Sequence, residues 1–134
     1  MDPAPQPRPR PIVLFERLSL GALVIGAVGA LFVWRDIAAQ MPADVSIATV
    51  LAVQALVFFV YAGLVLMVSR RRSNVARWIL TVLFAIGAVS SLGDLAAAFA
   101  ISPLAATVNV VQLAMLGAAI LLTFNAAARP WFAR

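Results

Sequence analysis

Four long apolar segments separated by short polar ones dominate the pattern of this chain. The segments cover about residues 12–34, 45–68, 78–101 and 104–124, and Asp94 is the one charged residue well inside any of them. The second segment has 24 residues. As a helix it extends about 36 Å and crosses a hydrocarbon layer of ~30 Å. Membrane strands are shorter, about 9–11 residues, and alternate apolar with polar positions. The pattern therefore predicts four transmembrane helices.

Short connections indicate how these helices pack. Residues 35–44 and 69–77 are brief and polar. Ser102-Pro103 makes a tight reversal, because the residue before a proline avoids the helical region. Helices joined by short loops are antiparallel neighbours. We therefore predict an all-α membrane protein, an antiparallel up-down-up-down four-helix transmembrane bundle over residues 12–128. The proline-rich residues 1–11 should form a cytoplasmic tail and residues 129–134 a cytoplasmic C-terminal end.

The first segment has one rival interpretation, which is a secretory signal peptide. Its uninterrupted apolar run, Leu18–Trp34, has 17 residues, whereas a signal peptide carries ~7–15 apolar residues. Arg35 and Asp36 follow at once. Both features favour a transmembrane helix, with Glu16 and Arg17 as an ion pair at its membrane boundary.

Composition agrees with lipid as the surrounding phase and excludes several chemistries. The chain of 134 residues is 64% hydrophobic and 11% charged, whereas soluble domains have about 25% charged residues. It has no cysteine and no histidine, which excludes thiol chemistry, thiolate zinc and histidine-ligated haem. No catalytic motif is present. We expect no catalytic residues, no metal site, no cofactor and no enzymatic activity.

The arginines predict the orientation in the membrane. All ten basic residues are arginines, and only Arg35 falls on the side opposite to both termini. Because short cytoplasmic loops carry the excess of basic residues, both termini should be cytoplasmic. Arg70, Arg71, Arg72 and Arg77 form the densest group. They are interpreted as topology anchors or as a site for anionic lipid headgroups, at about 1 kcal/mol per arginine. No platform of aromatic and basic residues suggests a nucleic-acid partner.

Polar residues inside the spans are the candidate functional site. Asp94 lies about 12 Å from the end of its helix at ~1.5 Å per residue, and an acid at that depth should face the bundle interior or a wet cavity. Helical spacing and antiparallel packing put polar side chains of three helices in one layer. The layer is read as interhelical hydrogen bonding, as a proton-coupled transport site, or as a contact with a partner subunit. The predicted cluster is Gln54, Ser90, Ser91, Asp94, Asn109 and Gln112.

The first span carries a stripe of small residues, Ala22, Gly26 and Ala30. Small residues let helices approach closely. The stripe therefore indicates a helix-packing face, used either within this bundle or against a second copy or another subunit.

The stretch RRRSNVARWILTVLF, the turn marked by Pro103 and the end ARPWF resemble small four-span bacterial inner-membrane proteins, most of which have no assigned function. The resemblance covers the last two thirds of the chain. It implies a multi-pass protein of the bacterial inner membrane. In size alone the chain is similar to small multidrug-resistance transporters. Those carry a deep glutamate in their first helix, whereas Glu16 here lies at the edge of its span.

These observations lead to two functional hypotheses. The first is a non-enzymatic accessory or structural subunit that packs against a larger membrane complex or against itself. The alternative is a small proton-coupled transporter that uses Asp94 with the amides of Gln54, Asn109 and Gln112.

Overall fold

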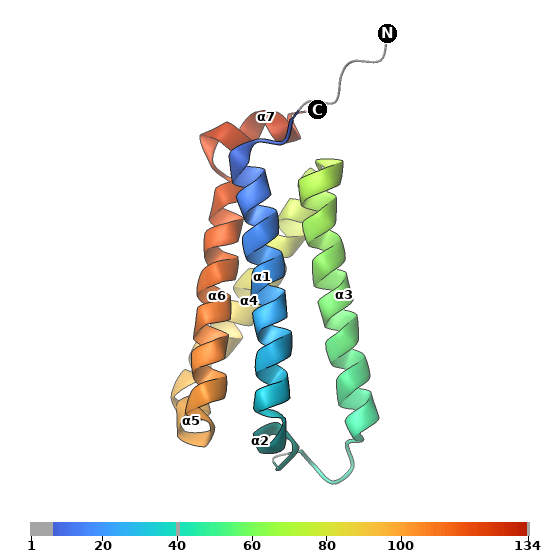
Figure 1. The fold of residues 1–134 in the computed structure, drawn as a ribbon, viewed down its shortest axis with the longest axis vertical. Helices are drawn as coiled ribbons and strands as arrows, with labels where there is room; N and C mark the ends of the chain where they lie inside the picture. The colour runs from blue at the N-terminus through green and yellow to red at the C-terminus, as the bar shows by residue number, and fades with distance from the viewer. Residues whose placement is uncertain (1–6, 40, 134) are drawn as a thin grey trace.

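The computed structural model describes residues 7–39 and 41–133, and this part of the chain is helical almost throughout (Figure 1). Four helices are long and apolar enough to cross a membrane, namely α1, α3, α4 and α6. The predicted fold class is thereby confirmed. In chain order the elements are α1 (Arg10–Phe32), α2 (Trp34–Ala39), α3 (Ile47–Arg71), α4 (Asn74–Gly93), α5 (Leu95–Ile101), α6 (Pro103–Thr123), η1 (Ala126–Ala128) and α7 (Arg129–Phe132).

The helix boundaries differ from the predicted ones, most clearly in the first span, in the first loop and in the third span. Helix α1 begins at Arg10, inside the predicted tail, because proline is compatible with the first helical turn; residues 1–6 of that tail lie outside the described residues. Part of the predicted loop 35–44 forms the short helix α2. The third span is not continuous: α4 ends at Gly93, and α5 begins at Leu95.

Helix α1 is the central element of the bundle. It packs along α6 on one side and against α3 on the other, while α4 crosses behind them (Figure 1). We call one end of the bundle the basic end. Helix α1 begins there, α3 passes into α4 there, and α7 lies there. The opposite end, where α2 and the α5–α6 turn lie, is called the α2 end (Figure 1).

The apolar core lies towards the basic end. Its buried residues come from four helices: Phe15, Val65, Val68, Ala76, Leu80, Ala119 and Ile120. All buried residues of α3 fall within its last seven positions, and those of α4 within its first seven. Towards the α2 end, α3 and α4 expose mainly apolar side chains. Such a surface is suited to hydrocarbon and unsuited to water.

The C-terminal segment closes the basic end. After α6, η1 and α7 fold back over the start of α1, where Ile12, Ala128 and Trp131 form a second buried cluster. The indole Nε1 of Trp131 donates to the carbonyl of Val68 at 3.3 Å. The guanidinium of Arg72 lies 4.1 Å from the centre of the Trp131 ring. Residues 129–133 are therefore part of the folded bundle.

Side-chain caps organise the α2 end. The hydroxyl of Ser102 donates to Oδ2 of Asp36 at 2.9 Å, which ties α2 to the α5–α6 turn. The same hydroxyl accepts from the backbone N–H of Ala105 and caps α6. Ser46 caps α3 in the same manner. Serine is favoured at this position because the first N–H groups of a helix have no intrahelical acceptor.

Candidate functional site

The described arginines gather at the basic end. Apart from Arg35 in α2, every one lies at or near this end, either in the segment leading into α1 and its first turns, at the α3–α4 connection, or in α7. Arg134 lies outside the described residues. The four predicted anchors have different surroundings: Arg71 is exposed, Arg70 is paired, Arg72 is stacked on Trp131, and Arg77 lines a cavity.

Glu16 is the acidic centre of this end. Its side chain is only 12% exposed and forms ion pairs with Arg8 at 2.6 Å and with Arg70 at 3.1 Å. Its partners are Arg8, just before α1, and Arg70 in α3, whereas the sequence predicts a pair with the adjacent Arg17. The reason is geometric: neighbours in a helix point about 100° apart, and Arg70 comes from the packed end of α3.

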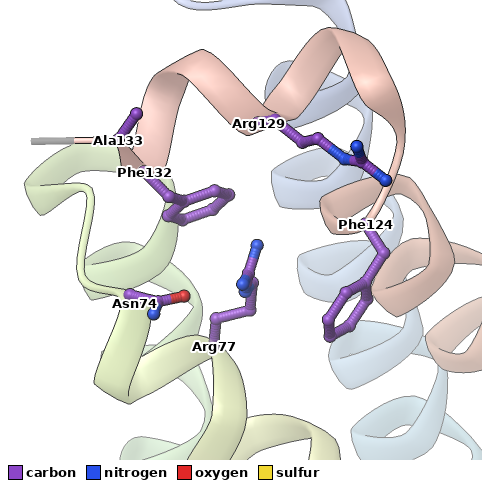
Figure 2. Close-up of a pocket in the computed structure, with 6 residues that line it drawn as sticks. All are labelled: Asn74, Arg77, Phe124, Arg129, Phe132 and Ala133. Atoms are coloured by element: carbon purple, nitrogen blue, oxygen red, sulfur yellow. The ribbon is translucent and has the colours of Figure 1, made fainter.

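A cavity of about 440 Å³ opens between the start of α4 and the C-terminal segment (Figure 2). It contains two guanidinium groups and one amide among aromatic walls. Figure 2 shows the side chain of Arg77 rising into the space between Phe132 and Phe124, with Asn74 and Arg129 at its edges. The lining residues are Asn74, Arg77, Phe124, Arg129, Phe132 and Ala133.

Aromatic rings hold the Arg77 guanidinium in place. Its central carbon lies 4.5 Å from the ring centre of Phe132 and 4.7 Å from that of Phe124. Its Nη1 donates to the carbonyl of Thr123 at 3.4 Å, close to the limit for a hydrogen bond. Its Nε is buried and has no hydrogen-bond partner among the described residues. Cation–π contacts orient the group but leave most of its N–H donors unused.

The predicted polar cluster is not brought together in the structure. Gln54 and Gln112 line one groove, while Ser90, Asp94 and Asn109 are exposed elsewhere and Ser91 is half-buried. Across residues 7–39 and 41–133, no hydrogen bond joins the side chains of these six residues. Residues at a similar depth in different helices can face different sides of the bundle, so a shared depth does not bring their side chains together.

The groove that contains the two glutamines lies between α1, α3 and α6 and has a volume of about 640 Å³. Its walls are small residues of α1, such as Gly26 and Ala30, and aromatic residues of α3, such as Phe58 and Tyr61. Asp94 does not line it. The groove therefore combines apolar walls with two amide side chains.

The small-residue stripe of α1 packs within the bundle. Ala22 is fully buried, and a Cβ built on Gly26 would lie 2.4 Å from the Nε2 of Gln112 in α6. Ala30 lines the groove instead. Gly29, beside the predicted stripe, also packs tightly: a built Cβ would lie 2.6 Å from Cγ1 of Val108, a stiffer side chain than that of Gln112.

Sequence reasoning missed the cavity around Arg77. It treated this arginine as one member of a loop cluster and did not associate it with Asn74, Arg129 or the two phenylalanines. One signal was available: α4 begins and α6 ends at the same membrane boundary, and both places are rich in aromatic and polar residues.

The fold and the four apolar spans define a multi-pass α-helical membrane protein. No protein-family model, curated protein or solved structure matches the chain.

Proposed function

We propose that this protein is a non-enzymatic accessory subunit of the bacterial inner membrane, with both termini in the cytoplasm, that packs laterally against a larger membrane complex or a second copy of itself. The arginine-rich basic end supports the orientation, because basic residues are retained on the cytoplasmic side. The resemblance to small four-span inner-membrane proteins supports the location.

The observation that carries the proposal is the exposure of Asp94. This carboxyl lies at the break between α4 and α5, its side chain is exposed, and no described residue pairs with it. A charged group that faces lipid at this depth costs about 2.5–3.5 kcal/mol even on insertion scales. Ser90, one helical turn earlier, is exposed as well. A polar surface of a neighbouring protein would satisfy both side chains.

Purification in a mild detergent tests the proposal. The tagged chain, taken from its native membrane, should elute as a defined assembly whose molar mass by light scattering exceeds that of one chain. Asp94→Leu should dissociate it, because the partner's polar group is left unpaired, whereas Asp94→Asn should keep it. Leu92→Ala is the matched control, since Leu92 is an exposed apolar residue two positions away. A lone wild-type monomer would contradict the proposal.

The alternative is a small proton-coupled transporter, and the groove between α1, α3 and α6 is the observation that favours it. Clefts of about 300–1,000 Å³ with apolar walls and a few polar groups are typical ligand sites. Its amides come from Gln54 and Gln112, but Asp94 is not among its lining residues. A transporter that uses Asp94 should lose function in the Asp94→Asn variant while it still folds, which is the reverse of the result expected for a subunit contact.

A further inference from the structure

The cavity around Arg77 has an excess of positive charge. The guanidinium groups of Arg77 and Arg129 both line it, and no aspartate or glutamate is among its lining residues. Of the described acids, Glu16 is engaged by Arg8 and Arg70, and the rest belong to α2, to the connection that follows it, or to the α4–α5 break. The two cationic groups therefore share a cavity without a protein counter-charge in the described part of the chain.

Most of the hydrogen-bonding capacity of Arg77 is also unused. A guanidinium carries five N–H donors, and among residues 7–39 and 41–133 the only acceptor found for Arg77 is the Thr123 carbonyl at 3.4 Å. Burying a donor without a partner is unfavourable, and the buried Nε of Arg77 is such a donor. The aromatic faces of Phe124 and Phe132 hold the guanidinium in place. The N–H groups along its edge are therefore oriented before a ligand binds.

The start of α4 adds to the positive electrostatic potential in this cavity. Asn74 is the first residue of this 20-residue helix and lines the cavity with its side-chain amide (Figure 2). Ser73 caps the N–H of Ala76. The N-terminus of a helix carries a partial positive charge, which favours anions nearby.

We propose that this cavity binds a phosphate group, held by the guanidinium groups of Arg77 and Arg129 and by the amide of Asn74. Arginine forks match the oxygens of phosphate and form paired charge-assisted hydrogen bonds with them. A volume of about 440 Å³ accommodates a phosphate with part of what it is bonded to. The same chemistry is offered by the headgroup of an anionic phospholipid and by free phosphate.

Two ligand arms distinguish these sources. The full chain in a neutral detergent is titrated with inorganic phosphate, against chloride at equal ionic strength, and its thermal unfolding is followed. In the second arm, phosphatidic acid and phosphatidylglycerol are added separately, with phosphatidylcholine as the zwitterionic reference, and bound lipid is counted by native mass spectrometry. Stabilisation by inorganic phosphate assigns the site to the phosphate group alone. Retention of anionic lipid without an effect of inorganic phosphate assigns it to a lipid headgroup.

Variants tie the binding to the cavity. Arg129→Gln and Arg77→Gln should each weaken binding about tenfold or more, as expected for the loss of hydrogen bonds to a charged group. Arg129 is exposed, so its substitution tests the site even if Arg77→Gln fails to fold. Arg71→Gln is the control, because Arg71 is exposed at the same end and does not line the cavity. Equal weakening by Arg71→Gln, or no binding of either probe to the wild type, overturns the proposal. Both readouts are independent of the assembly assigned to Asp94.

Discussion

A Cβ added to Gly29 in α1 would lie 2.6 Å from Cγ1 of Val108 in α6, so these two helices meet there without room for one more carbon. Val108 is β-branched and cannot turn its side chain away freely. We predict that Gly29→Ala lowers the free energy of unfolding by about 1–3 kcal/mol, the usual effect of overpacking. Unfolding in detergent, followed by circular dichroism, measures it. Gly21→Ala is the control on the same helix, since its built Cβ meets only Met115, at 3.5 Å; equal losses for both variants would disprove the close approach.

Trp131 should be a principal anchor of the C-terminal segment. It is 6% exposed, and its Nε1 donates to the carbonyl of Val68 in the last turns of α3, where carbonyls run out of intrahelical donors. Trp131→Ala should lower the free energy of unfolding by about 3–5 kcal/mol. Trp131→Phe, which keeps a ring but loses the donor, should cost about 1–2 kcal/mol, in the range of a single hydrogen bond. A Phe variant as unstable as the Ala variant would mean that the ring itself contributes little.

Arg72 ends α3 in the left-handed conformation, with φ 57°, and it also stacks on Trp131. These two properties can be separated. Arg72→Ala and Arg72→Gly both lose the stack, but glycine adopts the left-handed conformation without a steric cost. Arg72→Gly should therefore be more stable than Arg72→Ala by about 1 kcal/mol. Thermal unfolding of the two variants side by side measures the difference. An Ala variant of equal or higher stability would contradict the left-handed backbone conformation of Arg72.

Ser102 performs two tasks at the α2 end. It is 7% exposed, donates to Asp36 and caps α6. Ser102→Ala should lower the free energy of unfolding by about 1–3 kcal/mol, the sum of a lost cap and a lost hydrogen bond to a carboxylate. Ser46→Ala, at the exposed cap of α3, removes a cap without such a tie and should cost less. The prediction fails if the Ser46 variant is the less stable of the two.

The orientation is testable because the chain contains no cysteine. Single cysteines at Ala43, in the exposed connection before α3, and at Ala127, an exposed residue of η1, mark the two ends of the bundle. A membrane-impermeant maleimide added to cells with a permeable outer membrane should label Ala43→Cys and leave Ala127→Cys unlabelled. Permeabilising the inner membrane should expose both. The opposite pattern would reverse the proposed orientation.

The long helices followed from the sequence because each span must bond its own backbone in lipid, which makes long apolar runs predictive. The break at Asp94 could not be predicted from hydropathy. Hydropathy does not reflect the poor helix propensity of Gly93 or the preference of aspartate for helix ends. The rotation of each helix about its own axis could not be predicted from the sequence either. Depth along an axis placed Gln54, Asp94 and Asn109 in one layer, but packing determines the side on which each lies.

The cavity at Arg77, at the other end of the bundle, could not be predicted from the sequence for a similar reason. Its residues come from the start of α4, the end of α6 and the segment formed by α7 and Ala133. The arginines in residues 129–134 predict a cytoplasmic end of the chain. Nothing in the local pattern indicated that Trp131 would be buried against α1 or that Phe132 would reach Arg77. Such contacts depend on tertiary packing between segments about 50 residues apart.

The central claim is that four segments of this chain lie in hydrocarbon, and the partition of the full-length protein between membrane and buffer tests it most directly. Membranes from expressing cells are washed in alkaline carbonate and then extracted with or without detergent. The chain should stay in the carbonate-washed pellet and dissolve only when detergent is added. Recovery of the chain in detergent-free buffer as a soluble, monodisperse species would contradict the account.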